Sequence, residues 1–346
     1  MRTITLIPGD GIGPDVTNAA VRVIEATGVK ISYEKVDAGM SALSKSGHPL
    51  PARTIDSIRR NKVVLKGPLG TPIGEGFTSV NVQLRKIFNL HLNFRPIKSV
   101  EGVKGIHKGV DLLVCRENTE ELYTGEEDYI FDPVSREIIG AQVIGRITYV
   151  GSRRFFESVF QLARSMGRKK VTVLHKANIL KLTNGLFLEV GKEIAARYPE
   201  IHFEERIVDA GSMWVVMDPS QFDVIATTNL FGDILSDVFA GLVGGLGLIP
   251  AANIGTEYSI FEAVHGTWPA AAGKNLANPT AVILSSAMML DHINEKTAGE
   301  LIRRAVLKVI AEGKKVTKDI DRDAGVGTAE MTDEIIYTIT DLARGA

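Results

Sequence analysis

The chain has little cysteine and almost no net charge, and each of these features argues against a class of protein. A single cysteine, Cys115, among 346 residues excludes an intramolecular disulfide and is typical of a reducing compartment. Because Cys115 lies in the apolar stretch LLVCREN, we expect a buried strand residue rather than a nucleophile. The formal net charge of −1 provides no electrostatic surface for nucleic acid or anionic lipid, so neither partner is expected.

Long apolar runs are also missing. The amino-terminal segment reaches glycine, aspartate and proline before an apolar stretch of signal-peptide length could form. The longest uncharged stretch, residues 238–256, is rich in glycine and contains Pro250. We therefore expect a buried helix end and a loop there rather than a membrane span. These absences predict a cytoplasmic protein without membrane contact.

Strand-like and helix-like segments alternate along the chain, which is typical of an α/β fold built from βαβ units. Strands are expected at 30–39, 61–70, 90–97, 110–118, 169–176, 201–210 and 222–229. Helices are expected from Pro14 onwards and at 79–89, 153–167, 182–199, 278–293 and 333–345. Residues 125–149 instead form two β-rich stretches about a DPVS turn, which predicts a hairpin outside the main sheets.

The stretch IPGDGIGP, residues 7–14, has the glycine content of a dinucleotide-binding loop but not its spacing. The fingerprint is G-x-G-x-x-G; Gly9 and Gly11 fit it, whereas its third glycine position is occupied by Pro14. Proline suits the first turn of a helix, and apolar residues follow it at helical spacing. We therefore expect a strand, a tight structural turn and a helix that ends near Gly28.

Two aspartates mark residues 227–241 as a candidate metal site. Asp233 and Asp237 are four residues apart, which places both on one face of a helix that begins after Gly232. Apolar residues surround them, and no lysine or glutamate accompanies them as on an ordinary solvated face. Such a pair suits Mg²⁺ or Mn²⁺, although aspartates also favour the start of a helix because of its dipole alone.

Arginines and a candidate acid–base pair lie near the ends of the expected elements. Arg85 falls on a helix, and Arg95 and Arg116 fall at or beyond strand ends, where α/β proteins bind ligands. Three converging guanidinium groups would indicate a polycarboxylate ligand, whereas each alone is an ordinary surface arginine. Tyr123 and Lys176 each follow a strand, where they suit a proton donor and a general base but equally suit an exposed surface.

Nine motifs are spread over almost the whole chain: IPGDGIGP, LKGPLGTPIGEG, SVNVQLRK, RPI, RENTEELYTG, HKANILKLTNGLF, DPSQFDVIATTNLFGDILSD, GLVGGLGLIP and EAVHGTWPAAAGKNLANPT. Together they resemble the decarboxylating β-hydroxyacid dehydrogenases, the family of isocitrate, homoisocitrate and isopropylmalate dehydrogenases. The resemblance implies that family's α/β/α two-domain fold, which is not a Rossmann fold. We expect a large cofactor-side domain at 1–90 plus 245–346 and a small domain at 91–244, with a dimer-forming β excursion at 121–149.

The resemblance also implies substrate and metal residues. Arg85, Arg95 and Arg116 would bind the carboxylates of a hydroxy-tricarboxylate, while Ser79 and Asn81 would recognise the third carboxylate of isocitrate. Asp233 and Asp237 would hold Mg²⁺ or Mn²⁺ together with Asp209 contributed by a partner subunit. Lys176, also from the partner, would assist deprotonation of the substrate hydroxyl, and Tyr123 would protonate the product. These roles imply a homodimer with shared active sites.

The implied cofactor site does not involve the glycine-rich turn. The resemblance places the dinucleotide against Thr71, His265, Gly266, Thr267 and Asn278. NADP-type relatives carry a Lys-Tyr pair after HGTxP, whereas this chain has Ala270 and Ala271 at those positions, so we expect NAD. Lys318 or Arg322 remains a possible contact for the additional phosphate of NADP.

The expected activity is the Mg²⁺- or Mn²⁺-dependent oxidative decarboxylation of isocitrate to 2-oxoglutarate and CO₂ with reduction of NAD⁺. Homoisocitrate, isopropylmalate or tartrate dehydrogenase is an alternative that differs in the pocket around Ser79 and Asn81. A non-catalytic regulatory subunit of a hetero-oligomeric dehydrogenase is an alternative of another class. The presence of all the candidate acid–base and metal residues argues against the regulatory subunit.

Overall fold

The computed structural model describes residues 2–72 and 76–344, and the chain divides into two units. Unit 1 comprises 1–90, 95–111 and 237–346, and unit 2 comprises 91–94 and 112–236. Three elements contain residues of both units: β4 (Leu92–Lys98), β5 (Asp111–Glu117), of which only Asp111 is in unit 1, and α8 (Asn229–Leu242).

These limits differ from the boundaries expected in loops at 90/91 and 244/245, because unit 1 also includes 95–111 and 237–244. The limits at 94/95 and 236/237 fall inside β4 and α8, where a boundary drawn in a loop cannot lie. The expected domain boundaries remain a prediction.

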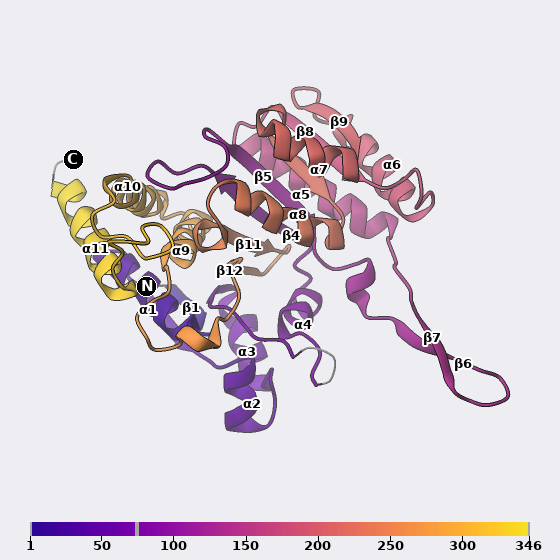
Figure 1. Ribbon diagram of the computed structural model, residues 1–346, viewed down its shortest axis with the longest axis horizontal. Helices are drawn as coiled ribbons and strands as arrows, with labels where there is room; N and C mark the ends of the chain where they lie inside the picture. Colours follow the sequence, from indigo (N-terminus) through magenta and orange to yellow (C-terminus); the bar gives the residue numbers. More distant parts are fainter. Residues whose placement is uncertain (1, 73–75, 345–346) are drawn as a thin grey trace. The chain divides into compact units, whose positions relative to one another are not determined.

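Unit 1 contains mostly parallel strands in the order β2-β1-β3-β12-β11 (Figure 1). Only the β11–β12 pair among them is antiparallel. The strands are β1 (Arg2–Ile7), β2 (Ile31–Lys35), β3 (Val63–Lys66), β11 (Pro250–Ile254) and β12 (Ser259–Ala263). The helices are α1 (Gly13–Ala26), α2 (Met40–Ser46), α3 (Ala52–Asn61), α4 (Val80–Ile87), α9 (Thr280–His292), α10 (Lys296–Glu312) and α11 (Thr328–Arg344). Helix α1 packs against α9 and α11, and α3 packs against β1 and β3.

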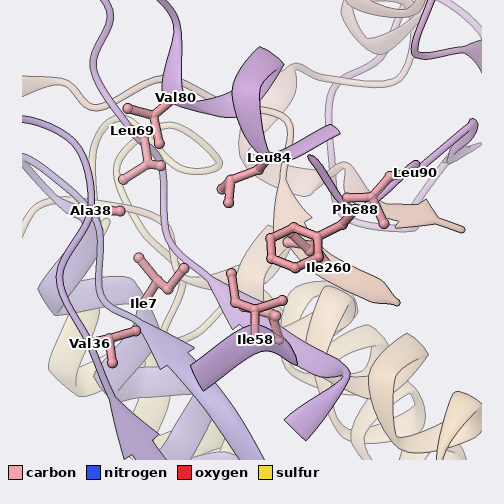
Figure 2. Close-up of a cluster of buried hydrophobic side chains, with 11 residues drawn as sticks. Ile7, Val36, Ala38, Ile58, Leu69, Val80, Leu84, Phe88, Leu90 and Ile260 are labelled. Atoms are coloured by element: carbon pink, nitrogen blue, oxygen red, sulfur yellow. The ribbon is translucent and has the colours of Figure 1, made fainter. Parts of the chain in front are cut away.

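One hydrophobic cluster of unit 1 joins α3 and α4 to the strands. Its side chains point toward one another in Figure 2, with Ile7 from β1, Ile58 from α3, Leu84 from α4 and Ile260 from β12. All four are buried, and Phe88 closes the cluster at the end of α4. The cluster is thus built from helices and strands that are far apart in the sequence.

Unit 2 contains parallel strands in the order β5-β10-β8-β9. These strands are β5 (Asp111–Glu117), β8 (Lys170–His175), β9 (His202–Ile207) and β10 (Val224–Thr227). The helices wholly within this unit are α5 (Tyr149–Ser165), α6 (Thr183–Ala195) and α7 (Val208–Met217). Helices α5 and α6 pack together through Phe155, Phe156 and Phe187, whose rings contact one another. The α/β fold class is therefore confirmed, and Cys115 is buried in β5 as expected.

The predicted hairpin is present in unit 2. Strands β6 (Glu127–Phe131) and β7 (Ile138–Val143) pair antiparallel and form a ribbon that extends from the rest of this unit (Figure 1). Its apolar side chains are exposed, among them Tyr129, Phe131 and Ile139. A two-stranded ribbon is marginally stable alone in water, so this one has surface available for further contacts.

Three local expectations are wrong. The helix with Asp233 and Asp237 was expected to begin after Gly232, but α8 begins at Asn229 and includes Gly232. Residues 201–210 are not one strand, because helix α7 begins at Val208 and places Asp209 in its first turn. Apolar residues lie on most sides of α7, so no 3.6-residue period marks it in the sequence. Residues 238–256 contain a strand, β11, where only a helix end and a loop were expected. This strand is stabilised by its pairing with β12, a contact that the glycine-rich sequence does not indicate. Within the described residues, no helix is long and apolar enough to cross a membrane.

Ile58 offers a test of the unit 1 core. Replacing Ile58 by alanine removes a fully buried side chain from the cluster and should lower the free energy of unfolding by about 2–5 kcal/mol. Ile106→Ala is the matched control, because Ile106 is 71% exposed and its truncation should change stability by less than about 0.5 kcal/mol. Denaturant unfolding measures both variants; equal effects would show that the cluster does not support unit 1.

Candidate active site

In unit 2, the first turns of α8 bind Arg116 and Tyr123 through hydrogen bonds and an ion pair. Arg116, at the end of β5, is 1% exposed and donates from Nε to Asn229 Oδ1 over 3.0 Å. Its Nη1 forms an ion pair with Asp233, and the Tyr123 hydroxyl donates to the other oxygen of Asp233 over 2.6 Å. A side chain at Gly232 would overlap Arg116, so this glycine allows the guanidinium to lie against α8.

The structure therefore brings together three of the predicted residues. Arg116 also lies over the Tyr123 ring, with its guanidinium carbon 4.9 Å from the ring centroid, which adds a cation–π contact. The Arg116 Nη2 atom is buried and has no hydrogen-bond partner among the described residues. A buried guanidinium with an unused donor can bind another carboxylate without breaking its existing bonds.

Lys176 and Asp209 form a separate pair in the same unit. Lys176 follows β8, and its Nζ lies 2.8 Å from Asp209 Oδ1. The hydrogen bond from Lys176 lowers the pKa of the Asp209 carboxyl, whose side chain is 69% exposed. In the described part of the chain, no three histidine, cysteine, aspartate or glutamate side chains gather into a possible metal site. The predicted set of Asp209, Asp233 and Asp237 is thus not assembled within one chain, and its completion by a partner remains a prediction.

The remaining predicted carboxylate-binding residues belong to unit 1. Arg95 was expected at or beyond a strand end, but it lies in the middle of β4, where it is buried. Its Nη1 lies 3.4 Å from Asp237 Oδ1, at the outer limit of a hydrogen bond. Asp237 is one helical turn beyond Asp233 on α8, so both carboxylates are on the same face of one helix. Both carboxylates are about half exposed, and the adjoining Ile234 is also exposed, so this face of α8 is accessible to solvent.

Helix α4 presents the other predicted substrate residues. Ser79 is the residue before the helix, and its hydroxyl makes no capping hydrogen bond. The Asn81 Oδ1 atom is buried and lacks a partner within residues 2–72 and 76–344. Arg85, in the last turn of α4, lies close enough to Glu262 for its positive charge to lower the pKa of that carboxyl. Polar groups left without helix-capping or internal partners are available to a ligand.

The predicted cofactor residues lie on loops of unit 1 that the glycine-rich turn supports. Thr71 is exposed, and Asn278 is buried and accepts a hydrogen bond from Thr280 N at the start of α9. Burial lowers the pKa of His265, whose Nδ1 lies 3.0 Å from the Gly266 carbonyl oxygen. The His265 Nε2 atom is buried without a partner in the part of the chain that the structure describes.

The turn at residues 7–14 touches both of these loops. The Ile12 N–H donates to the Thr267 carbonyl over 2.9 Å, and a side chain at Gly11 would overlap that same carbonyl. Asp10 accepts the N–H of Gly70 over 2.9 Å, one residue before Thr71. The turn thus holds these loops by backbone contacts; that it does not bind the phosphates of the dinucleotide remains a prediction.

Comparisons with known proteins identify the family of this chain. The model of the family described as isocitrate/isopropylmalate dehydrogenase matches residues 3–335. This chain belongs to the isocitrate/isopropylmalate dehydrogenase family. A crystal structure of isocitrate dehydrogenase from Methylococcus capsulatus is 54% identical, with a TM-score of 0.95 over 98% of this chain and 100% of that one.

Relatives in this dehydrogenase family carry several names at nearly equal similarity. A Drosophila melanogaster protein named as a probable mitochondrial NAD isocitrate dehydrogenase subunit alpha is 46% identical over 96% of this chain and 86% of its own. The isocitrate dehydrogenase [NADP] of Thermus thermophilus is 44% identical over 98% and 68%. The 3-isopropylmalate dehydrogenase of Archaeoglobus fulgidus is 45% identical over 97% and 98%. The family is therefore shown, and these similarities do not select the substrate or the cofactor.

The structure of this family member also contains a buried ion pair that the sequence analysis missed. Lys66, at the end of β3, forms an ion pair with Glu262 of β12, and Asn253 Nδ2 donates to Glu262 over 2.6 Å. Burial alone would raise the pKa of Glu262, but the positive charges of Lys66 and Arg85 hold it below its usual value. Charged residues inside the apolar runs VVLK and SIFEA are the signal that could have revealed this pair.

The charge of Lys66 should control how stability depends on pH. In the native protein the lowered pKa of Glu262 gives a stabilising contribution that is complete above about pH 4.5 and lost as the pH falls through the folded value. Lys66→Met leaves the Glu262 carboxylate buried without its ammonium partner, so its pKa should rise. The variant should lose about 3–5 kcal/mol at neutral pH and less near about pH 5, where the carboxyl can be protonated.

Urea unfolding at a series of pH values measures this difference. The matched control is the double variant Lys66→Met/Glu262→Gln, which removes both charges and should show the same deficit at each pH. A deficit of Lys66→Met that is independent of pH would mean that Glu262 is not the group responsible.

Proposed function

We propose that this dehydrogenase catalyses the oxidative decarboxylation of isocitrate, with NAD⁺ and Mg²⁺ or Mn²⁺ as cofactors. The observation that carries the proposal is the Arg116–Asp233–Tyr123 cluster at the start of α8. It joins a guanidinium with an unused buried donor, a carboxylate and a phenol. These are the groups that bind a carboxylate, ligate a hard cation and deliver a proton.

The residues present fit a divalent cation and a dinucleotide. Asp233 and Asp237 offer carboxylate oxygens on one helix face, and both side chains are accessible, 42% and 53% exposed. The buried, unpartnered Nε2 of His265 fits a polar atom of the dinucleotide. When bound, the cation supplies Lewis-acid polarisation of the substrate hydroxyl and NAD⁺ supplies the hydride acceptor.

The chain's own residues would bind the substrate and move its protons. Arg116 would use its free Nη2 on a substrate carboxylate, with Arg85 and Arg95 binding the others. The Asn81 Oδ1, which has no partner among the described residues, and the Ser79 hydroxyl, which makes no capping hydrogen bond, favour a further polar group on the substrate, as in isocitrate, over the alkyl branch of isopropylmalate. Lys176 would take the proton of the 2-hydroxyl, and Tyr123 would protonate the carbon that loses CO₂.

The choice of NAD⁺ over NADP⁺ rests on charge. Ala270 and Ala271 follow the HGTWP stretch, and their side chains provide neither a cation nor a hydrogen-bond donor for a 2′-phosphate. In this structure they lie in a short 3₁₀ helix, Pro269–Ala271, directly after the exposed Trp268.

We further propose a homodimer in which each active site takes Lys176 and Asp209 from the partner. Helix α7, which carries Asp209, exposes the large apolar side chains of Met213, Trp214, Val216 and Met217. Contiguous exposed apolar surface of this kind is typical of an interface. The exposed apolar residues of the β6–β7 ribbon would add a second contact between subunits.

An assay matrix tests the proposed activity. We expect NADH formation from isocitrate only with Mg²⁺ or Mn²⁺, and excess EDTA should abolish it. The kcat/KM for isocitrate should exceed those for homoisocitrate, isopropylmalate and tartrate by at least about tenfold, since the polar groups of α4 would otherwise be left unpaired. NAD⁺ should be preferred to NADP⁺ by at least about tenfold. A preference for isopropylmalate or NADP⁺ would contradict the corresponding half of the proposal, and no turnover of any acid would favour the regulatory-subunit alternative.

Complementation tests the shared active site. Lys176→Met and Asp233→Asn should each abolish activity, but their heterodimer has one site with both native residues. An equal mixture allowed to exchange subunits should therefore recover about a quarter of native activity. Lys176→Met mixed with Asp209→Asn is the matched control; both changes affect the residues given to the partner, so every site stays defective. No recovery in the first mixture, despite confirmed subunit exchange, would mean that each chain uses its own Lys176.

A further inference from the structure

Glu121 has an unusual backbone for a buried acidic residue. Its φ of 66° lies in the left-handed region, which residues other than glycine, asparagine and aspartate seldom adopt, yet it is only 7% exposed. Such a conformation persists only where surrounding contacts hold it, and these positions concentrate at functional sites.

The Glu121 carboxylate holds the start of α8. One oxygen accepts the Leu230 N–H over 2.7 Å and the other accepts the Thr228 hydroxyl over 3.1 Å. A carboxylate at a helix amino terminus satisfies a free N–H group and interacts favourably with the helix dipole. The segment that contains Glu121 is also fixed from the helix side, because Asn229 Nδ2 donates to the Glu120 carbonyl over 3.1 Å.

The Glu121 backbone is attached to a third element. Its N–H donates to the Arg146 carbonyl over 2.8 Å, just beyond the end of β7. Tyr123 follows two residues later in the 3₁₀ helix Leu122–Thr124. Glu121 thus connects the base of the β6–β7 ribbon, the segment that carries Tyr123 and the helix that carries Asp233.

We propose that Glu121 is a positioning residue that sets the contact between Tyr123 and Asp233. It fixes both partners of their 2.6 Å hydrogen bond. The backbone conformation of Glu121 sets the course of the segment that carries Tyr123, and its carboxylate holds the amino terminus of α8, which carries Asp233. This inference rests on the proposed function, because its consequence is the placement of a metal-binding carboxylate and a proton donor. A residue that only stabilised α8 would lower stability without altering metal binding or turnover.

Two variants of the protein test the proposal. Glu121→Gln keeps the shape and can still accept the Leu230 N–H, but it removes the charge. Glu121→Ala removes both hydrogen bonds. Loss of a residue that orients a metal ligand costs 10–100-fold in metal affinity or activity. We therefore expect Glu121→Gln to raise the Mn²⁺ dissociation constant and lower kcat by about tenfold, and Glu121→Ala to lower kcat by about a hundredfold. The KM for isocitrate should change less than kcat in both.

Mn²⁺ binding is measured directly on the substrate-free protein by electron paramagnetic resonance of free Mn²⁺, independently of turnover. Asp223→Asn is the matched control: Asp223 also accepts backbone N–H groups, those of Lys169 and Lys170, but just before β8 begins. It should lower the thermal midpoint while leaving Mn²⁺ affinity and kcat unchanged. If Glu121→Ala does not fold, Glu121→Gln decides the matter.

Native Mn²⁺ affinity and kcat in a folded Glu121→Gln variant would overturn the inference, as would equal losses in Asp223→Asn. Failure of the proposed function is a different result, because the unaltered protein would then show no Mn²⁺-dependent oxidation of any hydroxy acid.

Discussion

The Asp233 carboxylate, shared between the Arg116 guanidinium and the Tyr123 phenol, is the interaction on which the candidate site depends. Arg116 is almost fully buried, and a buried charge without its partner destabilises a protein by several kcal/mol. Electrostatics as well as packing therefore fix the relative positions of three segments: the end of β5, the segment with Tyr123 and the start of α8. The groups held there are those that a polycarboxylate and a hard cation need. The buried Nη2 of Arg116, which has no hydrogen-bond partner among the described residues, would let a substrate carboxylate bind while the ion pair with Asp233 stays in place.

The polar organisation of unit 1 follows the same physical rule. Lys66 and Glu262 compensate each other in the core, with Asn253 as a further hydrogen-bond donor. The Asp10 carboxylate joins the start of α2 to a separate loop by accepting the N–H groups of Met40, Ser41 and Gly70. In each case a buried acid organises backbone or a base around itself, so the cost of its burial is offset by bonds that also fix the loop geometry.

Several features were predictable from the sequence because the signal was local. The alternation of strand-like and helix-like segments predicted the α/β fold, and the DPVS turn predicted the ribbon. The spacing of Asp233 and Asp237 predicted that both lie on one helix face. The nine motifs identified the family, which the comparisons confirm. The roles assigned to individual site residues remain predictions, although the structure brings Arg116, Tyr123 and Asp233 together.

Other features were hidden because they depend on contacts distant in sequence. Helix α7 has no apolar period, and β11 is a strand through its pairing with β12. The importance of Glu121 was equally hidden, since its φ and its hydrogen bonds to residues 107 and 109 positions further along the chain have no sequence signature. Interactions of this kind appear only when the fold places the segments side by side.

Burial distinguishes which residues of the site are fixed and which can be exchanged. The Lys176–Asp209 pair is exposed, and exposed ion pairs contribute only about 0–1 kcal/mol, so this pair can separate at little cost. The Arg116–Asp233 pair is anchored by a buried guanidinium and cannot separate without a replacement anion. A residue offered to a second subunit must be free to leave its internal partner, whereas a residue that receives substrate must be held in place beforehand. The two pairs therefore differ as the proposed shared active site would require. The Lys176–Asp209 pair, which can separate, lies on and beside α7, the helix with exposed apolar side chains. The Arg116–Asp233 pair, which is fixed, joins β5 to α8.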